Sequence, residues 1–217
     1  MRFDIITIFP SIFDGFLKES LINKAIQKKH IKVNIHDLRR WADDAHKTVD
    51  EKPFGGGSGM VMKIGPIYRA VSEIKKENAR VILFTPRGKK FNQKKATDFS
   101  SCTQLIMICG RYEGVDERVA RYIADEEVSL GDYVLMGGEL PAMIVLETVS
   151  RLVPGVIGKD SFLEERKKSD GFLEYPQYTR PESFLINGKK RNVPKILLSG
   201  DHKKIEEWKS KKGKIIK

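Results

Sequence analysis

Three glycine-containing loops are the segments of this sequence best suited to chemistry, because they follow three consecutive predicted β-strands. They span residues 85–88, 110–114 and 130–138. In open α/β sheets, ligands bind beyond the carboxyl ends of the strands, where glycine lets the backbone approach them closely. Any one of these loops alone is best explained as a turn. Three in succession favour a cleft whose backbone N–H and C=O groups read an adenine edge and a ribose.

Several common motifs are absent from the sequence. No G-x-G-x-x-G follows the first apolar run, and neither G-x-x-x-x-G-K-[ST] nor G-x-S-x-G occurs. An ordinary dinucleotide-binding fold, a P-loop NTPase and a serine hydrolase are therefore not supported. Residues 54–60 are glycine-rich but lack a following Lys-Ser/Thr pair. They indicate a flexible loop near a site rather than a phosphate cradle.

The cysteines and histidines give no metal site. The two cysteines are Cys102 and Cys109, and the four histidines show no ligand spacing. Cys109 ends a strongly apolar run, which indicates a core position rather than a reactive thiol. With one disulfide bridge at most, the sequence indicates a reducing compartment.

Alternating strands and helices must position the three loops. Strands are expected over residues 3–9, 31–35, 80–85, 104–109 and 126–130. Helices are expected over residues 11–28, with Ser11 as N-cap, and over 66–77, 92–100, 115–124 and 139–152. This alternation predicts an α/β fold with a parallel sheet, and the continuous apolar runs predict strands that are buried on both faces.

The pattern changes after residue 158, which divides the chain into three parts. Residues 1–158 form the predicted α/β domain. Residues 159–174 are charged and weakly patterned, which predicts a mobile linker. Residues 175–217 form a short basic domain, with a hairpin turn at Asn187-Gly188 and a basic helix over 200–212.

Positive charge is concentrated in the last part of the chain. The net charge is +11, of which residues 1–158 contribute +4 and residues 159–217 contribute +7. A basic excess confined to one segment points to a polyanion, most commonly a nucleic acid. The alternative is a general lysine bias of the proteome. The N-terminal apolar run is too short and too polar for a signal peptide, and no run has the length of a membrane span, so we expect a cytoplasmic protein with no membrane association.

Long motifs resemble one family over almost the whole chain. They are HKTVDEKPFGGGSGMVMK (46–63), CGRYEGVDERV (109–119), SLGDYVLMGGELPAM (129–143), RLVPGVIG (151–158), YPQYTRPE (175–182) and VPKILLSGDHKKIEEW (193–208). In their unbroken order these runs resemble the TrmD family of tRNA guanine-N1 methyltransferases.

The resemblance implies a fold and a reaction. The fold is of the SPOUT type, with a parallel sheet, a deep trefoil knot near its C-terminal end, and a small, mostly helical C-terminal domain. The implied reaction transfers a methyl group from S-adenosylmethionine to N1 of the guanine 3′ of the anticodon in tRNA. The implied enzyme is a homodimer with each active site at the subunit interface. The resemblance also suggests dependence on Mg²⁺, although no residue cluster predicts a site for it.

The resemblance also assigns residues to the methyl donor, mostly through backbone groups in the three loops. These donor residues are Thr85, Pro86, Gly88, Gly110, Tyr112, Gly114, Leu130, Gly131, Asp132, Tyr133, Val134, Leu135, Gly137 and Gly138. For Leu130, Val134 and Leu135 the alternative is ordinary packing.

Two further residues match catalytic positions of the family. Arg151 resembles the arginine beside guanine O6, where a cation would stabilise developing negative charge. Its alternative role is a charge at the C-terminal end of a helix. Glu113 resembles the glutamate near the donor and the guanine, with a solvated loop residue as the alternative.

The general base is expected in residues 159–174, where the sequence departs from the family pattern. An ungapped alignment puts Arg166 at the base position, and an arginine cannot accept the N1 proton. One single-residue gap selects Glu165, which changes the spacing least and is our choice. The Asp-Ser-Phe triplet selects Asp160 instead, and Asp170 is a third candidate.

Two alternatives to the implied reaction are open at this point. One is a catalytically weakened tRNA-binding member of the same fold. The other is a related knotted methyltransferase that acts on ribosomal RNA or on a ribose 2′-OH. In each case we expect RNA phosphate contacts from the basic C-terminal residues Lys189, Lys190, Arg191, Lys203 and Lys204, although any single one is equally well explained as a solvated surface charge.

Overall fold

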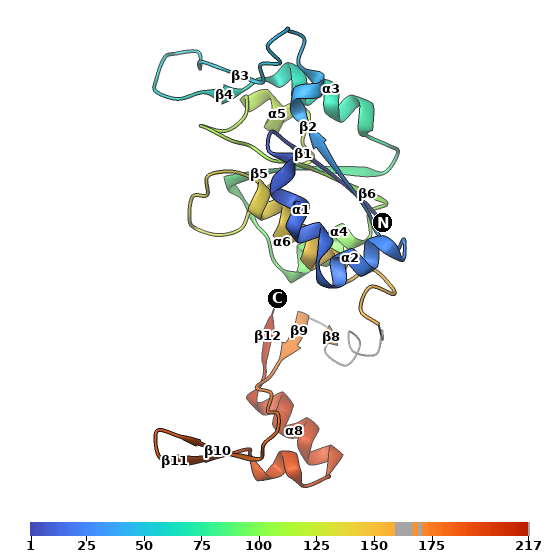
Figure 1. Ribbon diagram of the computed structural model, residues 1–217, viewed down its shortest axis with the longest axis vertical. Coiled ribbons are helices and arrows are strands. Elements are labelled where there is room, and N and C mark those ends of the chain that lie inside the picture. Colours follow the sequence, from blue (N-terminus) through green and yellow to red (C-terminus); the bar gives the residue numbers. More distant parts are fainter. Residues whose placement is uncertain (159–166, 169–170, 217) are drawn as a thin grey trace. The chain divides into compact units, whose positions relative to one another are not determined.

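The structure is a computed structural model that describes residues 1–158, 167–168 and 171–216. The chain divides into two compact units, Met1–Asp160 and Ser161–Lys217 (Figure 1). Among the described residues, no helix is long and apolar enough to cross a membrane.

A parallel five-stranded sheet forms the centre of the first unit, in the order β2-β1-β6-β5-β7. Its strands are β1 (Arg2–Thr7), β2 (Lys32–Asp37), β5 (Ala79–Lys90), β6 (Gln104–Ile108) and β7 (Glu126–Ser129). All five residues of β6, the middle strand, are buried. The predicted parallel α/β sheet is confirmed. Two short strands, β3 (Asp50–Glu51) and β4 (Val61–Met62), pair separately with each other.

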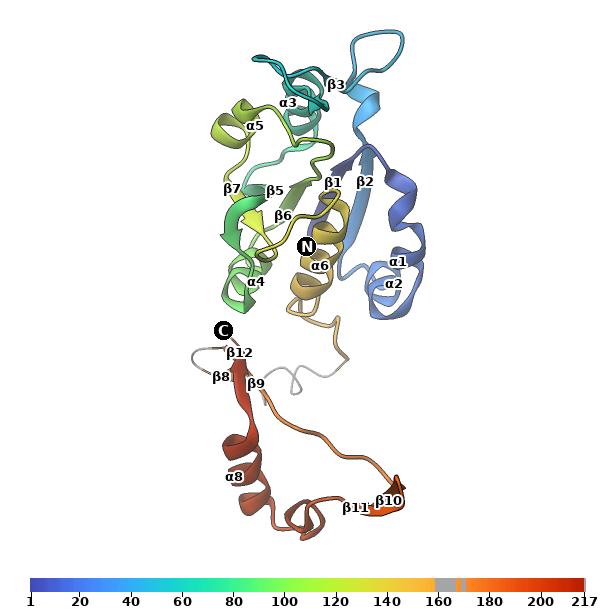
Figure 2. The same cartoon turned by 90° about the vertical axis from the view of Figure 1, so that its left-hand side faces the viewer.

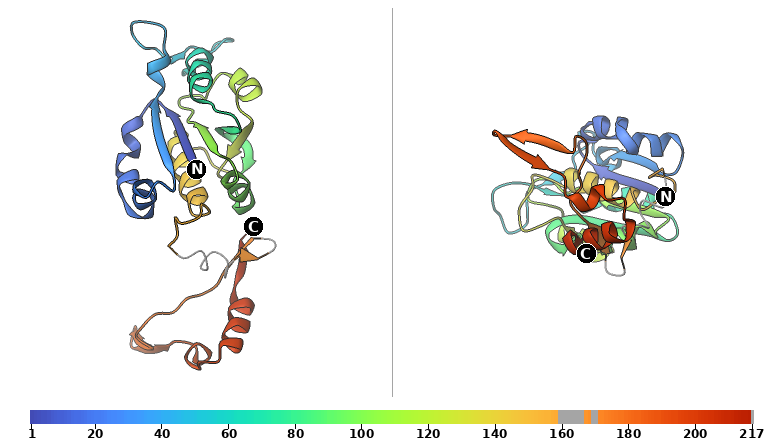
Figure 3. Two further views of the ribbon diagram at one scale, coloured as in Figure 1. Left: turned by 90° about the vertical axis from the view of Figure 1, so that its right-hand side faces the viewer. Right: turned by 90° about the horizontal axis from the view of Figure 1, so that it is seen from below.

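Helices cover both faces of this sheet, as Figures 2 and 3 show. On one face lie α1 (Asp14–Lys18), α2 (Ser20–Gln27), α4 (Gln93–Ser100) and α6 (Glu139–Ser150). On the other lie η2 (Leu38–Trp41), α3 (Ile64–Ile74) and α5 (Glu117–Tyr122). Side chains of a strand alternate between faces, so Leu105 and Met107 pack into the first core, and Ile106 and Ile108 into the second.

The expected single helix over residues 11–28 is wrong. A short 3₁₀ helix η1 (Pro10–Phe13) precedes α1, and an extended residue, Glu19, separates α1 from α2. Ser11 is not the N-cap either, because Phe9 holds that position and Pro10 begins the helix. Proline suits this first position, since its missing N–H has no partner there anyway. The apolar stripe continues across the break, so periodicity alone does not reveal it.

The strand expected over residues 80–85 continues to Lys90, with an interruption in the middle. Phe84 and Lys89 both pair with Val128 of β7, so residues 85–88 leave the ladder between them. A Cβ atom on Gly88 would lie 2.5 Å from the backbone nitrogen of Val128. This glycine therefore allows the excursion to close tightly against β7.

A buried carboxylate ties together three neighbouring strands of the sheet. Asp4 of β1 is fully buried and accepts hydrogen bonds from Arg2, Asn34 and Gln104, with His36 Nε2 at 2.8 Å. Burial alone would raise the pKa of this carboxyl, but these hydrogen bonds hold it well below its usual range. The polar cluster therefore links β1, β2 and β6 through buried side chains.

The second unit consists of small sheets and one α-helix. β9 (Gly171–Glu174) pairs antiparallel with both β8 (Lys167–Lys168) and β12 (Lys214–Ile216). β10 (Ser183–Ile186) and β11 (Lys189–Asn192) form the predicted hairpin, and α8 (His202–Lys212), preceded by η3 (Lys195–Leu198), is the predicted basic helix.

Other predictions for this region have different outcomes. The described residues of the second unit contain five strands beside one α-helix, so the expectation of a mostly helical domain is not confirmed. Residues 171–174 of the expected linker form β9, and residues 159–166 and 169–170 lie outside the described part of the chain. The mobile linker and the knot stay predictions.

Candidate functional site

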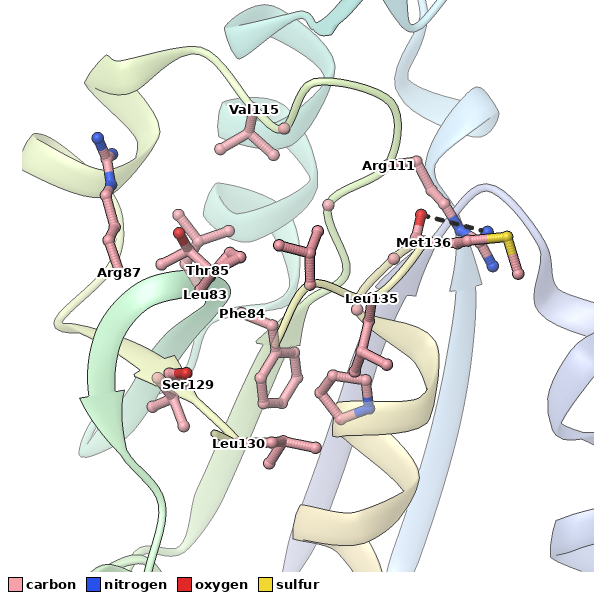
Figure 4. Close-up of a pocket in the computed structure, with 18 of the residues that line it drawn as sticks. Leu83, Phe84, Thr85, Arg87, Arg111, Val115, Ser129, Leu130, Leu135 and Met136 are labelled. Carbon is pink, nitrogen blue, oxygen red and sulfur yellow. Dashed lines mark hydrogen bonds between the residues drawn. The ribbon is translucent and has the colours of Figure 1, made fainter. Parts of the chain in front are cut away.

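A cavity of about 480 Å³ lies at the carboxyl ends of β5, β6 and β7 (Figure 4). Its volume falls within the roughly 300–1,000 Å³ typical of small-molecule sites. All three predicted loops contribute to its wall. The predicted donor residues on the wall are Thr85, Pro86, Gly110, Tyr112, Gly114, Leu130, Tyr133, Val134, Leu135, Gly137 and Gly138. Glu113, one of the expected catalytic residues, also lines the cavity.

Three predicted donor residues do not line the cavity, and each has another role. Gly88 packs its backbone against Val128, as described above. A Cβ atom on Gly131 would lie 2.6 Å from Cε1 of Tyr133, so the space beside this glycine holds the tyrosine ring. The carboxylate of Asp132 forms an ion pair with Lys90 at the surface.

The floor of the cavity is apolar. Figure 4 shows the side chains of Phe84, Leu130 and Leu135 converging there, and Pro141 of α6 completes the lining. Phe84 is 7% exposed and belongs to the core of the first unit. Core packing of the sheet therefore holds one side of the floor, at Phe84.

The lining includes residues that sequence reasoning missed. Besides Phe84 and Pro141, they are Leu83, Arg87, Arg111, Val115, Glu117, Val128, Ser129 and Met136. Most flank a predicted residue by one or two positions, so proximity to the glycine motifs was the available signal. Glu117 had no such signal, because it comes from the first turn of α5 rather than from a loop.

The second loop, residues 110–114, takes its shape from residues with positive φ and from an adjoining segment. Tyr112 has a φ of 60° and Gly114 a φ of 113°. The backbone N–H of Glu113 donates to the carbonyl of Met60 at 3.0 Å, and that of Met62 donates to Gly114 at 3.0 Å. These bonds tie the loop to the end of the glycine-rich segment 54–60.

That glycine-rich segment also meets the side chain of Glu113. A Cβ atom on Gly59 would lie 2.7 Å from Glu113 Cγ, so the segment runs close against this carboxylate. The expectation that it lies near a site agrees with this contact. The glutamate is therefore flanked by backbone on one side and faces the cavity on the other.

A buried ion pair connects the second and third loops. Arg111 Nε donates to Glu139 Oε2 at 2.8 Å, and Thr7 Oγ1 donates to Glu139 Oε1 at 2.7 Å. The guanidinium also lies over the ring of Phe9, at 4.8 Å from its centroid. Figure 4 marks the longer bond from Arg111 to the carbonyl of Met136 at 3.4 Å. A buried charge needs such partners, so Glu139 connects β1 and both loops.

Close backbone contact reinforces this connection. The N–H of Gly138 donates to the carbonyl of Gly110 at 3.0 Å, and a Cβ atom on Gly138 would lie 2.6 Å from Cys109 Cα. Cys109 is fully buried, and this burial raises the pKa of its thiol well above the usual value. The prediction of a core cysteine rather than a reactive one agrees with this environment.

Charged side chains also line the cavity. Arg87 forms ion pairs with Glu117 and with Glu127, the second at 3.2 Å. Hydrogen bonds from Arg87 and Arg121 lower the pKa of the Glu117 carboxyl below its usual value. Glu113 and Glu117 thus bring two carboxylates to the cavity, and the charge of Glu117 is balanced by its arginine partners.

Arg151, the second expected catalytic residue among those that the structure describes, does not line this cavity. Arg151 follows the last turn of α6 as its C-cap and lines a second cavity of about 350 Å³, together with Glu19 and Glu147. The candidate bases Glu165, Asp160 and Asp170 all lie outside the described residues. Within the described ranges, no group of three or more His, Cys, Asp or Glu side chains is arranged to hold a metal ion.

Comparison with known proteins identifies the family. Residues 1–215 match the family described as tRNA (Guanine-1)-methyltransferase TrmD. Similar proteins named tRNA (guanine-N(1)-)-methyltransferase include those of Dictyoglomus turgidum, 52% identical, and Geobacter sp. strain M21, 50% identical. Each of these alignments covers 97% of this chain and 84% of the relative. The Clostridioides difficile protein of the same name is 48% identical, over 96% of this chain and 90% of its own. The chain therefore belongs to the TrmD family of tRNA (guanine-N1)-methyltransferases, and it is an enzyme.

Proposed function

We propose that this enzyme transfers a methyl group from S-adenosylmethionine to N1 of the guanine on the 3′ side of the anticodon in tRNA. The observation that carries the proposal is the cavity at the carboxyl ends of β5, β6 and β7. All three glycine-containing loops contribute to it, and most of the predicted donor residues line it. Neither a catalytically weakened RNA-binding member nor an enzyme with another target is favoured by the relatives, which share one name.

The cavity suits this methyl donor in shape and in charge. Phe84, Leu130 and Leu135 offer an apolar floor for an adenine ring, and the glycines leave backbone groups open at the wall. Glu113 provides a carboxylate for a ligand that carries a sulfonium and an ammonium group. When bound, S-adenosylmethionine supplies an electrophilic methyl group that needs no further activation. The residues of the chain must therefore align the guanine, exclude water and remove one proton.

The guanine requires an acceptor for the N1 proton and a cation near O6. N1 is protonated at neutral pH, so a carboxylate must take this proton as the methyl group arrives. Negative charge then develops on O6, where a guanidinium stabilises it. We assign the first role to Glu165 and the second to Arg151. Glu113, at the cavity wall, orients the guanine beside the donor.

A homodimer accounts for the position of Arg151. Within one protomer this residue lines a different cavity from the donor residues. In a dimer, Arg151 of a second protomer is free to complete the site. Exposed apolar side chains support such an interface, since Leu140 and Ile144 of α6 are 54% and 45% exposed, and Met136 is 88% exposed. Large apolar patches of this kind mark interaction surfaces.

The second unit, with its basic helix α8, would hold the tRNA through phosphate contacts. The SPOUT-type knot is part of the same proposal, and it agrees with the strand order β2-β1-β6-β5-β7. We propose no binding site for Mg²⁺.

One assay tests the proposed reaction. The protein is incubated with methyl-labelled S-adenosylmethionine and tRNA transcripts, and the modified nucleoside is mapped to its position and atom. We expect 1-methylguanosine 3′ of the anticodon, and no product from a transcript with adenosine at that position. Methylation of another atom or position would refute the proposal.

A further inference from the structure

The hairpin of the second unit has two chemically different faces. Residues directly opposite each other in an antiparallel pair share a face, and successive residues alternate between faces. Phe184 pairs with Arg191, and Ile186 pairs with Lys189. These four residues form what we call the aromatic face. The opposite face carries Ser183, Leu185, Lys190 and Asn192.

The turn of the hairpin fixes this division. Asn187 and Gly188 have φ values of 51° and 72°, which are typical of a two-residue type I′ turn. Such a turn sets the register of both strands, and a slip of one residue would move every side chain to the other face. Lys189 and Arg191 are therefore held on the side of Phe184, while Lys190 is held on the other.

The side chains of the aromatic face are exposed, and all of its charges are positive. Phe184 is 63% exposed and Ile186 is 50% exposed, and both flanking charges are exposed as well. Residues 183–192 contain three basic residues and no acidic residue. Figures 1 and 3 show the hairpin projecting from the rest of its unit, away from α8. An exposed aromatic ring between two cations needs a partner that is anionic and offers a flat apolar surface.

We propose that the aromatic face binds an unpaired segment of the tRNA substrate, with Phe184 stacked on a base and Lys189 and Arg191 on the flanking phosphates. RNA-binding surfaces combine these two contacts, since aromatic rings stack on unstacked bases and cations neutralise the backbone. A duplex would leave the ring of Phe184 without a base, because paired bases expose only their edges. The inference rests on the proposed function only in naming tRNA as the RNA.

Matched variants of the full-length protein test this assignment. Binding of a tRNA transcript is measured at several salt concentrations for Phe184→Ala and Arg191→Ala. The control, Leu185→Ala, removes an exposed apolar side chain from the opposite face. Phe184→Leu and Phe184→Trp accompany them, because leucine keeps the apolar area and tryptophan keeps an aromatic ring. Circular dichroism verifies that each variant is folded.

The two contacts give separable results. Loss of a stacked ring weakens binding by roughly five- to a hundredfold, so we expect this loss for Phe184→Ala and Phe184→Leu, and rescue by Phe184→Trp. We expect Arg191→Ala to lower the slope of log affinity against log salt by about one. Leu185→Ala, on the opposite face, should leave affinity unchanged. Equal effects on both faces, or no effect of Phe184→Leu, would overturn the proposal.

Failure of this inference is distinct from failure of the proposed function. If the wild-type enzyme forms 1-methylguanosine but the two faces behave alike, only the hairpin assignment is wrong. If the faces differ in binding but no 1-methylguanosine forms, the hairpin assignment holds and the proposed reaction is wrong.

Discussion

The first unit buries both faces of a five-stranded sheet, whereas the described residues of the second unit bury one apolar side chain, that of Leu173. The helices of the first unit are held by the cores on either side of the sheet. In contrast, α8 of the second unit has no buried residue. Most helical stability in proteins comes from packing of an apolar face. Local interactions such as helix caps and turns must therefore contribute a larger share of the stability of the second unit.

The two units also differ in the kind of ligand that they suit. The cavity of the first unit is anchored to the core at Phe84, and a buried ion pair connects its loops. The second unit has exposed basic side chains on a hairpin and a helix. A cavity suits alignment of a small donor, and exposed cations suit a polyanion. We therefore expect the first unit to align the reacting atoms and the second unit to bind the RNA.

The largest expected effect is the loss of turnover on replacement of the proposed general base. If Glu165 accepts the N1 proton, Glu165→Gln should lower turnover by roughly a hundred- to ten-thousandfold, which is the usual contribution of general base catalysis. Donor and tRNA affinity should be unchanged, since both binding regions are intact. Single-turnover rates over a range of pH measure the effect, and the variant should also lose the fall in rate at low pH.

Asp160→Asn and Asp170→Asn are the controls for this experiment. Both should be mild if Glu165 is the base. A severe loss in Asp160→Asn would mean that the Asp-Ser-Phe match gives the correct register.

The difference in packing predicts a difference in stability. Leu105 is fully buried, so Leu105→Ala should destabilise the first unit by about 2–5 kcal/mol. Leu198 in the second unit is 49% exposed, so Leu198→Ala should cost about 0.5 kcal/mol or less.

The two tryptophans allow each unit to be followed separately. Trp41 lies in the first unit and Trp208 in the second. Urea unfolding of Trp41→Phe and Trp208→Phe backgrounds therefore reports on one unit at a time. Equal destabilisation by the two alanine variants would mean that the second unit has a core of its own.

Much of the first unit was predictable from the sequence, because its signals are local. Strands β1 and β6 and the first half of β5 are apolar runs, β2 alternates apolar and polar residues, and each glycine-containing loop follows a predicted strand. The family and its reaction follow from long motifs in unbroken order, and the comparisons confirm them. The hairpin was equally clear, since Asn187-Gly188 has few alternatives as a turn.

The remaining features depend on contacts between distant residues. Thr7 and Glu139 are separated by 132 positions, and nothing in either local sequence indicates their hydrogen bond. The contact of Gly131 with the ring of Tyr133 is likewise not indicated by the glycine motif alone. The break between α1 and α2 escapes periodicity because apolar residues continue on both sides of Glu19.

A smaller effect, which depends on pH, is expected for the stability that buried Asp4 contributes to the first unit. Asp4 is buried among hydrogen-bond donors, and its pKa is held below the usual value. Its charged form therefore adds stability above the usual carboxyl pKa, and this stability is lost as pH falls through the lowered value. Asp4→Asn should cost roughly 1–3 kcal/mol at neutral pH, by leaving donors imperfectly paired. The cost should shrink in acid.

Chemical denaturation at neutral and acidic pH measures this change. Asp201→Asn in the second unit is the matched control, because it removes an exposed charge while asparagine still caps a helix. Its effect should be small at every pH, since solvent screens exposed charges. A cost of Asp4→Asn that grows in acid would contradict the assignment.

The smallest expected effect compares two helix caps that are alike in chemistry and differ in their surroundings. Asn92 caps α4 by accepting from the N–H of Lys95 at 2.9 Å, and Asp201 caps α8 by accepting from Lys204 at 3.1 Å. Replacement by alanine removes about 1 kcal/mol from either helix. In Asn92→Ala, buried Ala96 and Phe99 should still hold α4, so its amide hydrogens should stay protected from exchange.

In Asp201→Ala, no buried side chain holds the first turn of α8, so amide protection there should fall. Hydrogen exchange followed by mass spectrometry or NMR measures both helices in the same way. Addition of tRNA should restore protection in α8 if its lysines contact phosphates, because a ligand that binds the ordered helix stabilises it. Equal loss of protection in α4 and α8 would show that packing does not distinguish the two units, and that caps alone set the stability of their helices.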